Sequence, residues 1–505
     1  MNKNGLIYDV NQKPPFGKNL LFAFQQVLAI LAATVLVPLL VDNNTGTMSQ
    51  SAALIGAGVG TIVYLLFTRF KSPVFLGSSF AFIPPLLTGV AYGYCGILLG
   101  SVFAGLVYVI IALIIKFVGA GWINKIMPPV IIGPTVALIG LSLAGSAMNN
   151  VMGISGDAIK NVTSQEIING FWQVSTATSY NLFGILVAII TFLVTVVISV
   201  KGSKGLKLIP FVIGVLAGYV VAALITLIGF EWLGYSYCKL INFSNFAKVL
   251  DFKNWLPNLT FIGAIGEIAD GKVMLDWTSI VSIFLAFAPV AMVVFAEHVA
   301  DHKNISSIIG KDLLKEPGLH RTLLGDGVGS MAGAFFGGCP NTTYGESIGC
   351  VAITKNASVS TILIAAIMCV VLAFIYPIML FIQSIPGCVV GGICIALYGF
   401  IAVSGLRMFK NVDLDNSKNL FVVASILIPG IGGLTLNFGD KGVNTFATPL
   451  IQISSIACAL ILGIIVNLIL KPSKAEVKKE VKYETATEET MFGTVAADKK
   501  EDSAE

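Results

Sequence analysis

Long apolar stretches, separated by charges, Gly/Pro clusters and short polar loops, run along most of this chain. Many are close to 20 residues, the length at which a helix crosses a hydrocarbon layer of about 30 Å. Because unpaired backbone groups are prohibitive in lipid, these stretches predict membrane-spanning helices. Seven predicted spans cover 19–41, 50–69, 73–90, 95–118, 127–144, 181–200 and 208–229. A second seven cover 279–299, 322–338, 341–355, 358–381, 388–405, 418–436 and 448–470.

The distribution of Lys and Arg tests these fourteen spans independently, because cytoplasmic loops hold an excess of both residues. With a cytoplasmic N terminus, the cytoplasmic loops and adjoining helix ends carry fifteen basic residues and the opposite loops carry six. Four of those six fall within the long stretch 230–278, and long loops follow the rule weakly. The pattern therefore predicts that both termini are cytoplasmic.

The third span of each set of seven differs from an ordinary apolar helix. The first reads SPVFLGSSFAFIPP (72–85) and the second GGCPNTTYGESIG (337–349), with Gly, Pro and hydroxyl residues at membrane depth. Seven spans per set would invert the second repeat relative to the first, and paired interrupted segments in such repeats indicate a binding site at the midplane. The alternative is a pair of kinked helices with small residues at their interfaces.

The domain organisation follows from these spans. Residues 1–18 are polar and lack the cleavage site of a signal peptide, so we expect a cytoplasmic N-terminal segment. The transporter domain covers 19–470, with a first repeat at about 19–229, an extracellular loop at about 230–278 and a second repeat at about 279–470. The charged, Ala/Thr-rich stretch 471–505 predicts a disordered cytoplasmic tail.

Composition agrees with a membrane protein and narrows its class. Of 505 residues, 56% are hydrophobic and 11% charged, and the formal charge of +4 gives no support for a nucleic-acid partner. The eight cysteines lie singly, without the spacing of a metal site or the density of a disulfide framework. An enzyme would need a nucleophile with its base or a metal set, and neither is visible. The loop G-x-x-x-x-G-K-[ST] of ATP hydrolysis is absent.

Two acidic residues at predicted membrane depth are the first candidates for chemistry. A carboxylate at the centre of a membrane helix costs about 2.5 to 3.5 kcal/mol, so each requires a reason. Glu297 ends the apolar run SIFLAFAPVAMVVFAEH, where an ion pair or a snorkelling carboxylate is the alternative. Glu346 lies in the second interrupted segment among polar neighbours, and Gly345 beside it allows a ligand to approach the backbone closely.

Asp301 lies four residues after Glu297, one turn along the same helical face. Two neighbouring carboxylates repel each other and can share protons, which suits a proton carrier. A solvated position at the cytoplasmic interface is the alternative for Asp301. His298 and His302 are either interfacial polar residues or members of a proton relay. Their pairing with carboxylates does not complete a metal ligand set, so we expect neither a metal site nor any cofactor other than the proton.

At these residues the sequence resembles the nucleobase/ascorbate transporter family, and within it the bacterial uracil permeases. The strings that carry the resemblance are ATVLVPLL, GSSFAFIPP, FAEHVADH, KDLLKEPGLHRTLLGDG, PNTTYGESIG and GGICIALYGFIAVSGLR. The resemblance implies an α-helical polytopic membrane protein of fourteen segments in two inverted repeats. It also implies core and gate domains, short strands in spans three and ten, and frequent homodimers in a bacterial cytoplasmic membrane.

The resemblance also implies roles for individual residues. Glu297 and Glu346 match the acids that bind substrate, Gly345 a backbone contact, and Phe80 the aromatic that packs on the base. Tyr344, Ser347 and Gln26 are supporting polar residues. Ser347 stands where the family signature usually has Asn, and Gln25-Gln26 replaces the usual Gln-His of span one.

These features predict a secondary transporter that imports uracil together with protons by alternating access. A pyrimidine presents N–H donors and carbonyl acceptors in one plane, which carboxylates and backbone N–H groups can bind. Xanthine or another nucleobase on the same fold is the main alternative, and an inorganic anion would be repelled by two carboxylates. A sodium-coupled carrier, a channel and a membrane enzyme are weaker alternatives.

Overall fold

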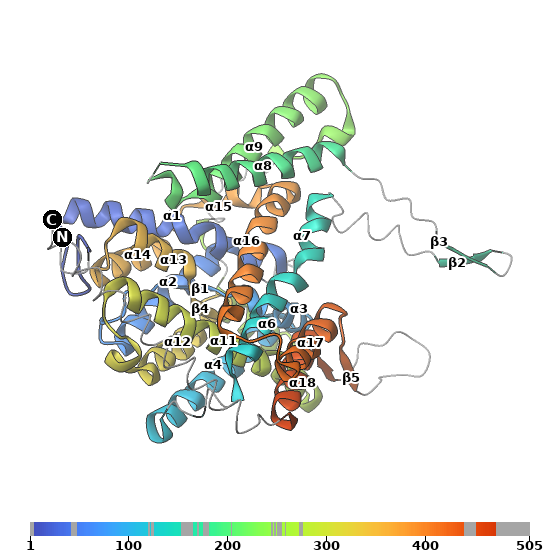
Figure 1. The fold of residues 1–505 in the computed structure, drawn as a ribbon. Helices are drawn as coiled ribbons and strands as arrows, with labels where there is room; N and C mark the ends of the chain where they lie inside the picture. The colour runs from blue at the N-terminus through green and yellow to red at the C-terminus, as the bar shows by residue number, and fades with distance from the viewer. Residues whose placement is uncertain are drawn as a thin grey trace, which may run out of the picture.

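The computed structural model describes most of the membrane part of the chain. The described residues are 5–41, 48–119, 122, 126–152, 165–168, 171–174, 181–203, 205–243, 246, 249, 255–257, 259–271, 276–438 and 451–470. The predicted tail 471–505 and the short loop near Asp42 lie outside them. Within this range eight helices are long and apolar enough to cross a membrane, or nine if a bent pair counts as one span. The chain is thus a helical, multi-pass membrane protein (Figure 1).

Helices occur at nearly all of the predicted apolar stretches (Figure 1). Those of the N-terminal half are α1 (Phe16–Val41), α2 (Gln50–Phe67), α3 (Ile83–Val90), α4 (Gly93–Val118), α6 (Pro129–Ser142), α7 (Ala144–Val151), α8 (Leu182–Lys201), α9 (Pro210–Ile225) and the π-helix η4 (Thr226–Trp232). Those of the C-terminal half are α10 (Thr260–Ala269), α11 (Trp277–Ile309), α12 (Leu319–Phe335), α13 (Gly345–Thr354), α14 (Val359–Leu372), α15 (Tyr376–Gln383), α16 (Gly387–Arg407), α17 (Ser417–Ile431) and α18 (Ser455–Ile469).

Local sequence signals set several helix ends. The side chains of Ser49, Asn181 and Asp276 each accept a hydrogen bond from a backbone N–H in the first turn of the following helix. Such caps satisfy N–H groups that have no partner within the helix. Helix α11 ends at Gly310, whose φ of 67° is the left-handed conformation that glycine adopts readily.

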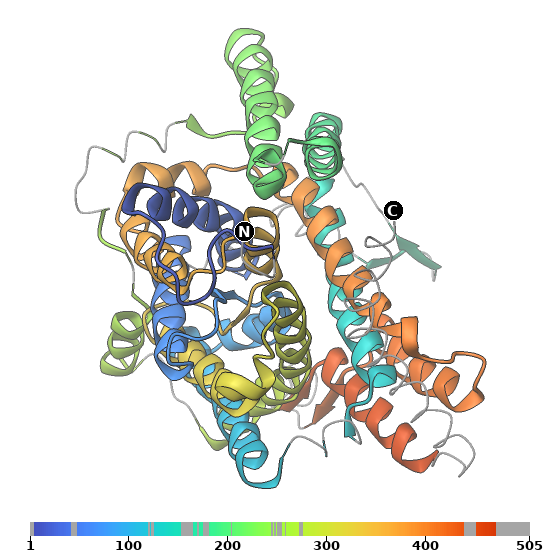
Figure 2. The same cartoon turned by 60° about the vertical axis from the view of Figure 1, so that its left-hand side comes forward.

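The helices form two bundles, which lie side by side in Figure 2. The first bundle contains α1, α2, α3, α4, α11, α12, α13 and α14, and the second contains α6, α7, α8, α9, α16, α17 and α18. Within the first bundle α2 and α12 cross very closely, since a Cβ added to Gly60 would lie 2.8 Å from the carbonyl oxygen of Gly329. Small residues allow such approaches between membrane helices.

The two interrupted segments meet at the centre of the first bundle. Strand β1 (Leu76–Ser78) is followed by the 3-10 helix η1 (Phe80–Phe82) and α3, and strand β4 (Asn341–Thr343) is followed by α13. The strands pair in antiparallel register, with Leu76 opposite Thr343 and Ser78 opposite Asn341. The prediction that neither segment is a complete helix is therefore confirmed, and the alternative of two kinked helices is wrong here.

Two predicted helix boundaries are wrong. The span expected at 279–299 continues as α11 to Ile309, because the polar residues beyond 299 have hydrogen-bond partners inside the protein. The span expected at 358–381 is two helices, α14 and α15, bent by 80° at a short break. Pro377, in the first turn of α15, lacks a backbone N–H and favours a new helix start there.

Smaller elements include the short helices η3 (Leu206–Leu208), η5 (Ser236–Cys238), η8 (Leu314–Gly318) and η9 (Met408–Asn411). Two further antiparallel pairs join β2 (Gln165–Ile168) to β3 (Phe171–Val174) and β5 (Leu436–Phe438) to β6 (Ile451–Ile453). Residues 5–15, the N-terminal strap, run along the start of α14. Leu6 and Val10 are buried, the amide of Val359 donates to the carbonyl of Val10 at 3.1 Å, and Asp9 pairs with Lys311 at 2.8 Å. The strap thus ties the N terminus to the end of the first bundle.

Candidate functional site

The paired strands β1 and β4 form the base of the candidate site. Such short strands leave some backbone N–H and C=O groups without a partner in the sheet, and side chains from neighbouring helices form hydrogen bonds with them. The hydroxyl of Thr61 on α2 lies 3.0 Å from the amide and 3.1 Å from the carbonyl oxygen of Leu76. The hydroxyl of Ser330 on α12 lies 2.6 Å from the amide of Asn341. Irregular backbone is tolerated at membrane depth only where protein satisfies it in this way.

Three carboxylates border the strands. Glu297 and Asp301 lie one turn apart on α11, and Glu346 lies in the first turn of α13. The hydroxyl of Thr343 in β4 donates to Oδ2 of Asp301 at 2.6 Å, so this face of α11 is directed at the strands. All three carboxylate residues are partly exposed although β4 itself is buried, and therefore they can meet a ligand. Asp301 is held by the protein, which contradicts the alternative of a solvated interfacial residue.

The start of α13 is fixed by hydrogen bonds on both sides. The hydroxyl of Tyr344 donates to the carbonyl of Ser78 in β1 at 2.8 Å. The amide of Gln26 on α1 donates to Oγ of Ser347 at 2.9 Å and to its carbonyl oxygen at 3.2 Å. Gly345 between them is exposed, and a Cβ added there would meet nothing within 4 Å. Helix N-termini favour negative charge and direct free N–H groups outward, which suits both Glu346 and a ligand carbonyl.

Phe80 begins η1 directly after the β1 segment and is 9% exposed. Its ring contacts Tyr398 of α16 in an edge-to-face arrangement, with ring centroids 6.1 Å apart. Phe80 belongs to the first bundle and Tyr398 to the second. The aromatic pair therefore joins the two bundles just after strand β1. The hydroxyl of the buried Tyr398 has no hydrogen-bond partner among the described residues.

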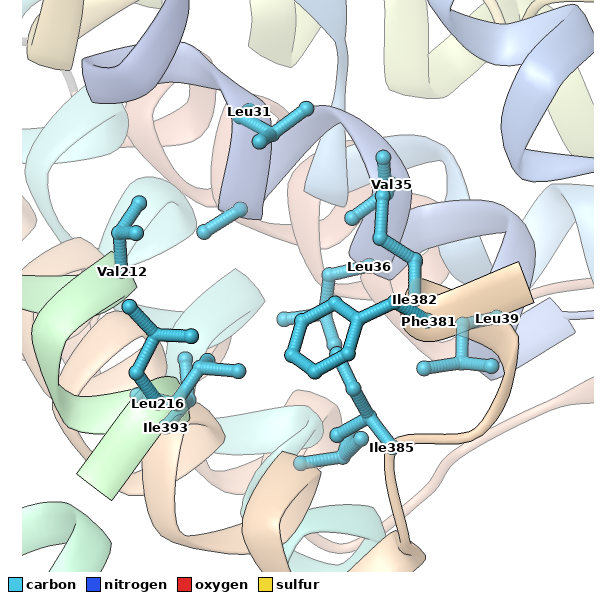
Figure 3. A pocket seen from close by; sticks show the side chains of 13 residues that line it. Leu31, Val35, Leu36, Leu39, Val212, Leu216, Phe381, Ile382, Ile385 and Ile393 are labelled. Atoms are coloured by element: carbon cyan, nitrogen blue, oxygen red, sulfur yellow. The ribbon is translucent and has the colours of Figure 1, made fainter. Parts of the chain in front are cut away.

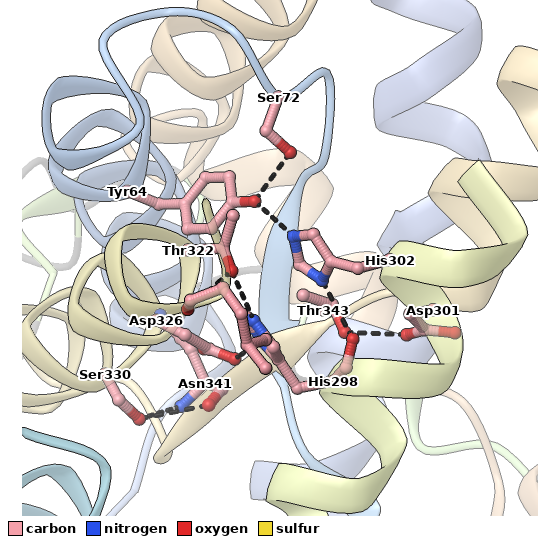
Figure 4. Close-up of polar contacts among 11 residues, drawn as sticks. Tyr64, Ser72, His298, Asp301, His302, Thr322, Asp326, Ser330, Asn341 and Thr343 are labelled. Atoms are coloured by element: carbon pink, nitrogen blue, oxygen red, sulfur yellow. Dashed lines mark hydrogen bonds and ion pairs between the residues drawn. The ribbon is translucent and has the colours of Figure 1, made fainter. Parts of the chain in front are cut away.

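A buried hydrogen-bond network lies behind the carboxylates (Figure 4). Nδ1 of His298 lies 2.7 Å from Oδ2 of Asp326 on α12, and Nε2 lies 3.1 Å from the hydroxyl of Thr322. One turn later, Nδ1 of His302 lies 2.8 Å from the carbonyl oxygen of His298. Because a carbonyl only accepts, this nitrogen carries the proton. The fully buried histidines are therefore not interfacial residues.

The network extends from α11 to α2 as well as to α12 (Figure 4). The hydroxyl of Tyr64 lies 2.7 Å from Nε2 of His302 and 2.7 Å from Oγ of Ser72. These bonds fix the rotation of α11 about its axis. Since Glu297 and Asp301 occupy the neighbouring face of the same helix, the network also fixes the direction in which both carboxylates point.

Asp326 and Tyr398 are candidate residues that the sequence reasoning missed. Asp326 is completely buried, and its Oδ1 has no partner among the described residues. Asp326 lies in the predicted span 322–338, and the cost of a carboxylate in a membrane helix, which singles out Glu297, singles out this acid as well. The string LLGDG, which contains Asp326, contributed to the family resemblance but not to the predicted site. No signal in the sequence distinguished Tyr398 from other aromatic residues of apolar helices. Among described residues, no three His, Cys, Asp or Glu side chains gather as a metal site.

Comparison with known proteins places this arrangement among membrane transporters. The model of the xanthine/uracil permeases, described as "Permease family", matches residues 17–438. The uracil permease of Bacillus caldolyticus is 36% identical over 481 residues, which cover 94% of this chain and 97% of the relative. The uracil permease of Escherichia coli (strain K12) is 34% identical, and the match covers 92% of this chain and 93% of the relative.

Solved structures of other transporters share the fold at low sequence identity. The transmembrane domain of a cyanobacterial bicarbonate transporter, BicA, superposes with a TM-score of 0.56 at 14% identity, covering 91% of this chain and all of that domain. Murine Slc26a9, an anion transporter in the inward-facing state, gives a TM-score of 0.54 at 13% identity, covering 91% of this chain and 69% of that protein. At these identities the likeness concerns the fold alone.

Proposed function

We propose that this chain, which belongs to the xanthine/uracil permease family and is a transporter rather than an enzyme, imports uracil together with protons. The observation that carries the proposal is the group of three carboxylates and an open glycine around two paired strands at the centre of the first bundle. The relatives named uracil permeases support uracil as the substrate.

Uracil binds between α11, α13 and η1 in this proposal. The ring N–H groups donate to Glu297 and Glu346, because ionised carboxylates are strong hydrogen-bond acceptors. A ring carbonyl accepts from backbone N–H groups at the start of α13, where Gly345 leaves the backbone uncovered. Phe80 covers one face of the base, and aromatic rings suit that contact. Tyr344, Ser347 and Gln26 hold α13 in place through the bonds described above.

Proton coupling is assigned to Asp301 together with Glu297. Neighbouring carboxylates in a shielded site share protons, and the pair rather than either residue determines the apparent titration. Protonation reduces the repulsion between them and so accompanies substrate loading. Release of the proton on the cytoplasmic side then completes import. A sodium ion would require several oxygen ligands around one point, and no group of acidic residues in the described part of the chain has that arrangement, so sodium coupling is the less favoured alternative.

Transport proceeds by alternating access, in which the binding site opens to one side of the membrane and then to the other. Fourteen segments in two inverted repeats allow this movement. The first bundle acts as the core domain that carries the substrate, and the second as the gate domain. The matching positions of β1 and β4 and their antiparallel pairing support this interpretation. Both termini are cytoplasmic, the stretch 230–278 faces outward, and the protein dimerises in a bacterial cytoplasmic membrane.

Transport of radiolabelled uracil into proteoliposomes tests the proposal. We expect accumulation when the outside is made acidic, and loss of accumulation when a protonophore collapses the gradient. Unlabelled uracil should compete better than xanthine. Preferential competition by xanthine would favour the purine alternative, and uptake that requires sodium and ignores the proton gradient would exclude proton coupling.

A further inference from the structure

An apolar crevice lies between the two bundles, and none of the three carboxylates lines it (Figure 3). It is open on one side, and the space between its walls, with part of the open surroundings, measures about 590 Å³. Its walls come from α1, α9, α15 and α16, and include Leu31, Val35, Val212, Phe381 and Ile393. Every lining residue is Ala, Val, Leu, Ile or Phe. The crevice therefore offers no side-chain hydrogen bond to a ligand or to water.

The crevice continues into the apolar outer surface of the second bundle. Leu216, on α9, lines the crevice and is itself 47% exposed. Further along α9, Val220 is 56% exposed and Leu224 is 51% exposed. In a multi-pass membrane protein such exposed side chains face lipid. A lipid chain can therefore pass from the surface of α9 into the crevice without leaving an apolar environment.

The crevice also lies where the chain passes from one bundle to the other. Helix α14 belongs to the first bundle, and after the 80° bend α15 packs against α2 and leads within a few residues to α16 of the second bundle. Phe381 of α15 forms part of the crevice wall, and its ring contacts Tyr219 of α9, with centroids 4.7 Å apart. The hydroxyl of Tyr219 lies 2.9 Å from that of Ser384. One wall is thus a connecting helix that is attached to α9.

We propose that this crevice binds the acyl chain of a membrane lipid between the two bundles. The lining excludes ligands that need hydrogen bonds, including a nucleobase. The crevice wall continues through the half-exposed Leu216 onto the exposed apolar face of α9, and a hydrocarbon chain satisfies both conditions. The bound chain fills the space between α1 and α16 and supports the bend between α14 and α15.

Photolabelling in proteoliposomes tests this site. The probe is a phosphatidylethanolamine with a diazirine in one acyl chain, mixed into phosphatidylethanolamine and phosphatidylglycerol, and labelled peptides are identified by mass spectrometry. We expect labels on the crevice side of α1 and α15 as well as on the outer surface of α9. Labels confined to the exposed surface of α9 would overturn the proposal.

Ala32→Phe fills the crevice from α1, and Leu224→Trp adds an aromatic residue on the same lipid-facing helix outside it. In Ala32→Phe the new ring should displace about two methylenes of the lipid chain from the crevice. Labelling of α15 should therefore fall on the order of tenfold. Leu224→Trp should label like the wild type. Retained uracil binding confirms that Ala32→Phe is folded, and Ala32→Gly, which enlarges the crevice, provides a second variant. Wild-type labelling of α15 in both Ala32 variants would show that no chain occupies the crevice.

Discussion

The carboxylates of Glu297 and Glu346 are the residues on which substrate binding depends most in our proposal. Glu297→Gln and Glu346→Gln keep the side-chain size and replace a charged acceptor with a neutral amide. A hydrogen bond to a charged group contributes about 1.5–3 kcal/mol, so each change should weaken uracil binding by about 10- to 150-fold. Equilibrium binding of radiolabelled uracil to the purified protein measures the effect.

Glu316→Gln is the matched control for these two variants. Glu316 is exposed in the short element η8, where the hydrogen bond from Lys71 and its positive charge hold the pKa of that carboxyl below its ordinary value. Uracil affinity should be unchanged in this variant. Wild-type affinity in either Glu297→Gln or Glu346→Gln would remove that residue from the binding site.

Asp301 allows binding and coupling to be separated. In Asp301→Asn the amide oxygen can still accept from Thr343, so the local structure is preserved while the group no longer takes up a proton. We expect exchange of uracil between preloaded vesicles to continue and accumulation driven by a pH gradient to be lost. The measurement compares the rate of uracil exchange with the extent of pH-driven uracil accumulation in one preparation of proteoliposomes. Accumulation with wild-type pH dependence in Asp301→Asn would refute the coupling role.

The three carboxylates Glu297, Asp301 and Glu346 could be predicted from the sequence, whereas the buried histidine network behind them could not. Glu297, Asp301 and Glu346 are conspicuous because charge is rare in apolar stretches. His298 and His302 follow the end of the predicted span, where polar side chains could equally face water. Only their contacts with Asp326 and Tyr64, on helices distant in sequence, show that they are buried.

The N-terminal strap is an element whose attachment depends on few contacts. Although partial burial opposes the effect, the hydrogen bond and charge of Lys311 and the amide of Val10 hold the pKa of Asp9 below 3.8. Because the folded pKa is lowered, the pair contributes stability above the ordinary Asp pKa and loses it as the pH falls through the lowered value. The strap should therefore loosen only in acid.

Charge reversal tests the strap near neutral pH. An exposed ion pair contributes about 0.2–1 kcal/mol, so Asp9→Lys should increase the rate of limited proteolysis within the strap by roughly 1.5- to 5-fold. The double variant Asp9→Lys, Lys311→Asp restores the opposite charges but not the bond from the amide of Val10, so it should be cleaved more slowly than the single variant. Equal cleavage of the single and double variants would mean that this pair does not hold the strap.

At the level of elements, apolar length predicted where helices lie but not how they bend. The stretch 358–381 reads as one long apolar segment, yet it contains a break before Tyr376-Pro377. Conversely, α11 continues past the apolar run, because Asp301 and His302 find partners inside the protein. Hydropathy reflects the free energy of placing a side chain in lipid. It does not include hydrogen bonds that distant segments of the folded chain provide.

The orientation of the whole molecule can be tested because all eight cysteines are buried and should react little. We expect Tyr235→Cys to react with a membrane-impermeant maleimide on intact cells, since it follows η4 in the stretch assigned to the outside. Lys315→Cys, on the exposed loop between α11 and α12, should react only after permeabilisation. Reaction of Lys315→Cys on intact cells would overturn the proposed orientation and the fourteen-segment topology.

The pairing of β1 with β4 has a consequence for how the protein is made. Tyr344 lies 266 residues after Ser78, whose carbonyl accepts its hydrogen bond. At about 5–20 residues per second, a ribosome needs roughly 13 to 50 seconds to synthesise that interval. During this time the first interrupted segment is present without its partner strand. A nascent chain shortened before residue 341 should therefore be a preferred substrate for membrane quality control, even when every helix that it contains has been inserted.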